Sequence, residues 1–145
     1  GQIIHAYKWI PKNDGNLNGN QIKAVLHIVH GMGEHARRYS EFAQYLNSFG
    51  FAVYAFDQRG HGKTAGSPDK FGHQADKNGW MLVVEDVKQL TEIIKKENPA
   101  VVLNALKIKK VAIHNFLKGT MTKASLNPCM IKSKLLLAFE SVNGS

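Results

Sequence analysis

The chain has 145 residues, of which 43% are hydrophobic and 21% charged, and this composition is typical of one globular domain and excludes a disordered chain. Its formal net charge of +8 is unevenly placed, because residues 101–145 contain seven lysines and one glutamate while residues 1–100 are nearly balanced. A single cysteine excludes an internal disulfide framework, no apolar run is long enough to span a membrane, and no signal peptide is visible, so we expect an intracellular protein.

The first thirty residues predict two strands. Residues 3–10 are rich in β-forming side chains and end at Pro11, a residue typical of a strand end. Residues 12–20 have the composition of a loop. Residues 21–30 then form a nearly continuous apolar run, which favours a strand buried on both faces of a parallel sheet.

A helix, a second buried strand and a second helix follow. Apolar residues recur at helical spacing over residues 39–49, and Gly50 is placed as a C-cap glycine. Residues 51–56 predict the strand, and residues 57–74 a long loop rich in glycine. The helix expected over residues 79–97 has an apolar face made of Trp80, Val83, Val84, Val87, Leu90 and Ile94.

This alternation of strands and helices predicts an α/β fold with a mostly parallel sheet, flanking helices and right-handed crossovers. The composition changes near residue 100, since 11 of the 13 glycines lie before it. We therefore divide the chain into an α/β portion, residues 1–100, and a basic tail, residues 101–145. Within the tail, residues 110–117 are the candidate for a third parallel strand and residues 131–139 for a short helix.

The first buried strand leads into a glycine-rich segment at the edge where ligands bind in open α/β sheets. In this segment Gly31 and Gly33 flank Met32, and free backbone N–H groups at such a position can stabilise an oxyanion. A plain tight turn is the alternative interpretation. His30 and His35 would allow a pair of metal ligands, but no third ligand is evident, so we expect no metal site.

A second glycine-rich segment follows the second buried strand. Residues 62–64 end like a phosphate-binding P-loop, but that motif needs glycine at position 57, and we expect further loop rather than a helix after the segment. Asp57 is expected to brace the loop by accepting backbone N–H bonds. Gly60, His61 and Gly62 are expected to be structural, because no nucleophile lies near His61 in the sequence.

The two segments together resemble the monoacylglycerol lipase and lysophospholipase group of the α/β-hydrolases. The likeness is carried by residues 30–35 (HGMGEH), by Arg38 and Tyr39 at the start of a helix, and by residues 51–62 (FAVYAFDQRGHG). It covers about residues 6–99, including Gly66, Trp80, Asp86 and Val87. The resemblance implies that the chain holds the N-terminal part of an α/β-hydrolase fold.

The resemblance also implies a chemistry and a set of roles. The family hydrolyses carboxylic esters with a Ser-Asp-His triad and no cofactor. Its oxyanion-hole N–H corresponds to Met32, supported by His30, Gly31 and Gly33, while the Asp57 loop is structural. Acyl esters or lipids would be the substrates, with peripheral membrane contact and a cytoplasmic or membrane-peripheral location.

The sequence departs from the family where the nucleophile should be. The family places its serine in a G-x-S-x-G elbow on the strand after the second helix, but no serine of this chain has glycine two residues before and two after it. In the expected strand, Asn115 and Leu117 stand where the serine and the closing glycine would be, and no aspartate follows Glu97. We therefore identify no catalytic residue and expect the chain to be inactive alone, with a non-catalytic binding or regulatory form as the alternative.

The tail allows two explanations. It is either translated from a non-homologous source, such as a retained intron or a shifted frame, or a genuine divergent tail that caps a truncated sheet. A truncated sheet would leave an uncovered edge through which chains self-associate. We expect no nucleic-acid partner, because the basic tail lacks arginine, aromatic interleaving and a known binding motif.

Overall fold

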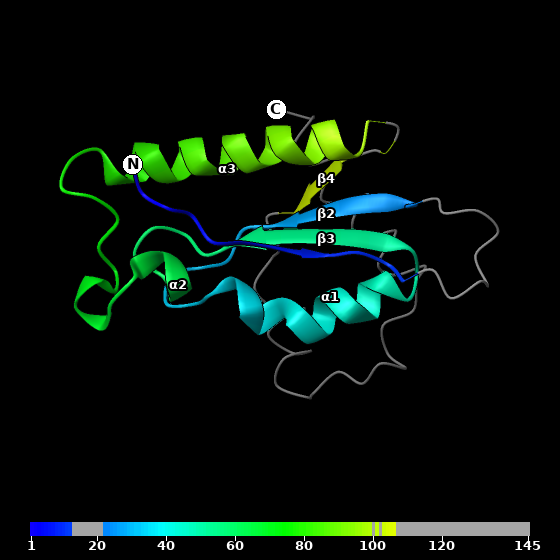
Figure 1. Cartoon of the computed structure of the whole chain (residues 1–145), viewed down its shortest axis with the longest axis horizontal. Coiled ribbons are helices and arrows are strands. Elements are labelled where there is room, and N and C mark those ends of the chain that lie inside the picture. Colours follow the sequence, from blue (N-terminus) through cyan, green and yellow to red (C-terminus); the bar gives the residue numbers. More distant parts are fainter. Residues whose placement is uncertain (13–21, 100, 102, 107–145) are drawn as a thin grey trace, which may run out of the picture.

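The computed structural model describes residues 1–12, 22–99, 101 and 103–106 (Figure 1). The strands are β1 (Ala6–Trp9), β2 (Ala24–Ile28), β3 (Phe51–Phe56) and β4 (Leu103–Leu106). The helices are η1 (Ala36–Tyr39), α1 (Ser40–Asn47), α2 (Gly62–Ala65), η2 (Pro68–Lys70) and α3 (Gly79–Glu97). The expected loop at residues 12–20 lies almost wholly outside the described residues.

The four strands form one mixed sheet in the order β1-β3-β2-β4. β2 pairs in parallel with β3 on one side and with β4 on the other, and β1 pairs antiparallel with β3 at the edge. Figure 1 shows α1 on one face of the sheet and α3 on the other. The expected α/β fold with a mostly parallel sheet and flanking helices is therefore confirmed.

The third parallel strand lies earlier in the chain than the sequence suggests. β4 is formed by Leu103–Leu106 and runs beside β2, with Leu106 opposite Ile28. The expected strand at residues 110–117 and helix at residues 131–139 lie outside the described residues. The sheet thus extends past the division drawn at residue 100, and a separate tail stays a prediction for the residues after β4.

The sheet is buried on both faces, as the apolar runs of β2 and β3 predict. Toward α1, the core consists of Leu26, Ile28, Ala36, Tyr39, Ala43, Leu46, Val53 and Ala55. Toward α3, it consists of Val25, Ala52, Tyr54 and Ile94. Alternate residues of each strand point to opposite faces, so two adjacent apolar runs fill both layers.

The first turn of α3 differs from expectation. Helical periodicity predicts Trp80 on the apolar face of this helix, yet its side chain is 69% exposed. Figure 1 shows the start of α3 projecting past the carboxyl ends of β2 and β3, so the sheet offers nothing there for an indole to pack on. Val83, one turn later, is buried.

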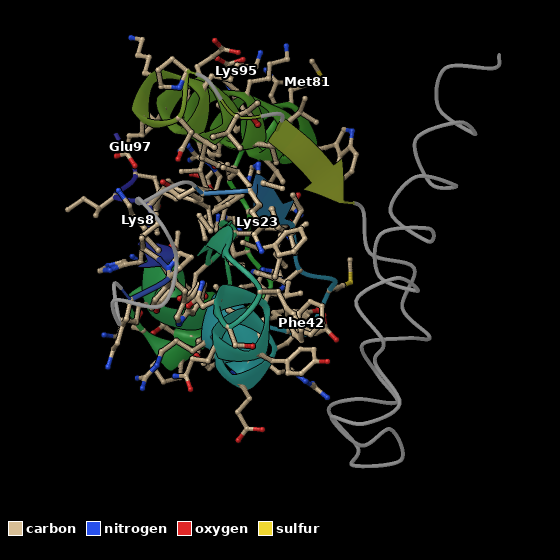
Figure 2. All side chains as sticks on the ribbon, turned by 90° about the vertical axis from the view of Figure 1, so that its right-hand side faces the viewer. Lys8, Lys23, Phe42, Met81, Lys95 and Glu97 are labelled. Carbon is tan, nitrogen blue, oxygen red and sulfur yellow. The ribbon has the colours of Figure 1, made fainter. Side chains whose placement is uncertain are left out.

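The opposite end of α3 is fixed to two strands through Glu97. Its carboxylate forms an ion pair with Lys8 of β1 and accepts a hydrogen bond from the Tyr54 hydroxyl of β3 at 2.8 Å. Figure 2 shows the Lys8 and Glu97 side chains reaching toward each other between the two elements.

In the part of the chain that the structure describes, no helix is long and apolar enough to cross a membrane.

A histidine lies within the layer between the sheet and α3. His27 of β2 is 1% exposed, and its Nδ1 lies 3.2 Å from the Thr91 hydroxyl, which itself donates to the Val87 carbonyl. Nδ1 therefore carries the proton, and the buried Nε2 has no hydrogen-bond partner among the residues that the structure describes. Burial lowers the pKa of His27 to about 4, because a charged ring there would be desolvated.

Replacing His27 by leucine should flatten the acid dependence of stability. The unfolded chain binds a proton at His27 near pH 6.5, whereas the folded chain resists protonation until about pH 4. The neutral His27 ring should thus make its full contribution to the free energy of unfolding above pH 6.5. Up to about 3 kcal/mol of this free energy should be lost as the pH falls to 4. His27→Leu should remove most of this loss, as measured by urea unfolding at pH 7 and pH 4.

The matched control is His73→Leu, because His73 is exposed. This variant should keep the wild-type dependence. An unchanged acid dependence in His27→Leu would contradict the assignment of a buried neutral ring at this position.

Candidate functional site

The first glycine-rich segment forms a tight turn after β2. The Glu34 N–H donates to the Gly31 carbonyl at 3.3 Å, and Gly33 has a φ of +73° at the third position of the turn. Met32, at the second position, has no positive φ. This combination defines a type II turn, in which glycine is the favoured third residue.

Met32 lies at the surface, and its backbone N–H is the group of interest. The side chain is 86% exposed. Among the residues that the structure describes, none accepts a hydrogen bond from the Met32 N–H. The donor that the resemblance assigns to an oxyanion hole therefore has no acceptor in the described part of the chain.

The Glu34 side chain stabilises the turn by hydrogen bonds. Its carboxylate accepts the Gly31 N–H at 3.0 Å and the Tyr39 hydroxyl at 2.6 Å. Burial alone would raise the pKa of Glu34, but the hydrogen bonds from Tyr39 and Gly31 outweigh it and hold this pKa below its usual value. Burial, followed by the bond to Glu34, raises the pKa of Tyr39. Glu34 is thus an ionised acceptor, which sequence inspection did not single out.

The second segment forms a matching turn after β3. The His61 N–H donates to the Gln58 carbonyl at 2.9 Å, and Gly60 has a φ of +72°. A Cβ at Gly60 would lie 2.7 Å from the backbone of His73, so close approach as well as backbone angle requires glycine there. The two type II turns stand at the ends of two neighbouring parallel strands.

Asp57 connects these turns and β1. Its Oδ1 accepts the Ala36 N–H at 2.7 Å, and its Oδ2 accepts the Lys63 N–H at 2.9 Å and the Tyr7 hydroxyl at 3.0 Å. The carboxylate is 1% exposed. A Cβ at Gly62 would lie 2.3 Å from Oδ2, so only glycine leaves room for it.

The segment after the second turn is not further loop, contrary to expectation. α2 begins at Gly62, directly after His61. The Lys63 N–H of its first turn is satisfied by Asp57, whose side chain replaces a bound anion at this helix start. The P-loop interpretation still fails, because Asp57 stands where that motif needs glycine.

His30 and His61 lie between the two turns, with ring centroids 5.1 Å apart. His30 is 4% exposed, and burial, the largest influence, lowers its pKa. His30 and His35 are not brought together with a third ligand: over the described ranges, no group of three metal-ligating side chains is close enough to hold a metal.

An ion pair that the sequence did not reveal anchors the second turn to α3. The Arg59 Nε and Nη2 atoms donate to the two oxygens of Asp86 at 2.7 and 3.0 Å. The side chains of Arg59 and Asp86 are 15% and 5% exposed. The available signal was Asp86 itself, an acid among the apolar positions of a helix, because a buried carboxylate needs a cationic partner.

A polar cleft of about 420 Å³ lies beside α2. It shares Arg59 and Gly60 with the second turn but includes no residue of the first. We therefore place the candidate site at the first turn.

Replacing Asp57 by asparagine should destabilise the chain by about 2–3 kcal/mol, because one amide oxygen cannot replace both carboxylate oxygens and the amide NH2 would face a backbone N–H. Urea unfolding at pH 7 measures the change. The control Asp76→Asn, at a side chain that is 95% exposed, should have little effect. Equal stability of the two variants would contradict the bracing role.

Comparison with known proteins agrees with this architecture. A family model described as serine aminopeptidase, S33 (Hydrolase_4) matches residues 20–106. The monoacylglycerol lipase of Mycolicibacterium smegmatis is 35% identical over 91 residues, which are 63% of this chain and 28% of that protein. The monoglyceride lipase of Mus musculus is 31% identical over 101 residues, which are 70% of this chain and 29% of that protein.

Among solved structures, a thermostable carboxyl esterase from Bacillus coagulans in complex with glycerol superposes with a TM-score of 0.60. It is 31% identical, and the match covers 70% of this chain and 30% of the esterase. The chain thus spans less than a third of the length of each of these relatives. With the family match over more than half of its residues, the chain belongs to the S33 family of the α/β-hydrolases, in the monoacylglycerol lipase-like group.

Proposed function

We propose that residues 20–106 supply the oxyanion-binding half of a carboxylic ester hydrolase that acts on monoacylglycerols or related lipid esters. The observation that carries the proposal is the Met32 N–H, which has no acceptor among the described residues and sits in a braced turn at the end of β2. The names of the monoacylglycerol lipase relatives support the substrate class. Such a donor stabilises the negative charge that develops on the carbonyl oxygen during acyl transfer.

In an elbow, the serine stands on the turn directly after a strand. In this chain that strand would be β4, so the nucleophile would have to follow it. After Leu106 the sequence reads Lys107, Ile108, Lys109 and Lys110, which contain neither serine, cysteine nor glycine. No serine anywhere in the 145 residues has the glycine spacing of an elbow. We therefore propose that this chain by itself binds the charge of an acyl transition state without attacking the ester.

The purified chain should not react with a fluorophosphonate probe, because no activated serine is present to displace fluoride. Mass spectrometry of the treated protein measures this directly. The monoacylglycerol lipase of Mycolicibacterium smegmatis, treated in parallel, controls for the probe. Stoichiometric labelling of any serine in this chain would overturn the proposal that its sequence lacks a nucleophile.

The oxyanion role can be tested by completing the fold. In a chimera, the 91 matched residues of this chain replace their counterparts in the same mycobacterial lipase, and we expect hydrolysis of monoacylglycerol. Met32→Pro in this chimera should lower kcat by about 10²–10³, since proline suits the second position of a type II turn but has no N–H. Met32→Ala keeps the N–H and should keep kcat.

Equal kcat for the proline and alanine variants would show that Met32 is not the donor. A chimera that folds but hydrolyses no ester would favour the alternative, a non-catalytic binding or regulatory form. That form is supported by the position of β4 at the edge of the described sheet, because a strand edge can pair with another chain.

A further inference from the structure

The two turns exchange hydrogen bonds through a pair of histidines. His30 belongs to the first loop, and its Nε2 accepts the N–H of Gln58 in the second loop at 3.0 Å. His61 belongs to the second loop, and its Nε2 accepts the N–H of Gly33 in the first loop at 3.3 Å. Each loop therefore provides one ring and one backbone donor to the other.

These partners fix the protonation of both rings. A backbone N–H only donates, so each Nε2 must be unprotonated, and the proton of each neutral ring lies on Nδ1. At that position each ring meets a carbonyl of its own loop: Gly31 lies 2.8 Å from Nδ1 of His30, and Arg59 lies 2.9 Å from Nδ1 of His61. Both nitrogens of both rings are thus in use.

The bonds of the two histidines fall on the two peptide groups that flank Met32. The Gly31 carbonyl, which accepts from His30, belongs to the same planar peptide as the Met32 N–H. The Gly33 N–H, which donates to His61, belongs to the peptide on the other side of Met32. Because a peptide is planar and trans, holding its carbonyl also fixes the direction of its N–H.

We propose that His30 and His61 are positioning residues that together aim the Met32 N–H, each ring holding one of the two peptides beside it. The identification of this N–H as an oxyanion donor rests on the proposed function. The reciprocal hydrogen bonding of the two loops does not rest on the proposed function. The proposal gives His61 a role across the loops, beyond the loop in which it stands.

The bond from Gln58 to His30 is sensitive to pH, because protonation of the His30 ring would place an N–H on Nε2 opposite the Gln58 N–H. The ionisable groups that face His30 are Glu34 and Asp57, which favour the charged ring, and His61, which opposes it. Burial dominates and lowers the pKa of His30. The bond from Gln58 to His30 is therefore expected to persist below pH 6.5 and to break as the pH falls through the lowered value.

Nuclear magnetic resonance of the full chain tests the proposal. At pH 7.5 we expect scalar couplings across two N–H···N bonds, from the Gly33 nitrogen to Nε2 of His61 and from the Gln58 nitrogen to Nε2 of His30. The coupling to His30 should vanish on acidification, while amides in the centre of β3 stay protected from exchange. Absence of both couplings at pH 7.5 would overturn the proposal without any substitution.

A variant series separates this role from general packing. His61→Phe should accelerate exchange of the Gly33 amide about tenfold, which is the loss of roughly one hydrogen bond. His61→Gln supplies an amide oxygen and should restore most of the protection, and His73→Phe, at an exposed histidine, should leave it unchanged. Equal exchange of the Gly33 amide in wild type and His61→Phe would overturn the role of His61.

The outcome is distinguishable from failure of the proposed function. If the chimera hydrolyses no ester while the Gly33 and Gln58 amides respond as expected, the histidines hold the turn and only the purpose of the Met32 N–H is lost. If the amides do not respond, the positioning role is wrong whatever the ester assays show.

Discussion

The carboxylate of Asp57 accepts hydrogen bonds from three segments that are far apart in the sequence, and the geometry of the site depends on them. Tyr7 comes from β1, Ala36 from the start of η1, and Lys63 from the start of α2. Two of these donors are backbone N–H groups at helix starts, which have no acceptor within their own helix and need another one when buried. One side chain therefore satisfies both helix starts and fixes the distance between the turns that precede them.

Elements with strong local signals could be predicted from the sequence. β3 occupies Phe51–Phe56 and α3 occupies Gly79–Glu97, as the apolar patterns and flanking residues indicate. β4 could not be placed, because its four residues are one of several short apolar stretches after Pro99, and only pairing with β2 selects among them. Trp80 could not be placed either, because helical periodicity does not reveal where the sheet beneath a helix ends.

In the candidate site, too, only the features with a local sequence signal could be predicted. Glycine spacing identifies both turns, since a positive φ leaves a mark in the sequence at Gly33 and Gly60. The partners that hold the turns leave no local mark, because the Arg59–Asp86 pair joins residues 27 positions apart and the His61–Gly33 bond residues 28 apart. The buried polar groups were visible as exceptions to an apolar pattern, but their partners only become evident in three dimensions.

At Met32, the side chain is 86% exposed while the peptides on either side are held. At such a position the backbone geometry is fixed by its neighbours, while the identity of the side chain is free to change. Natural variants at residue 32 would then differ in the surface that an approaching ester first meets, while the direction of the donor stays the same in all of them.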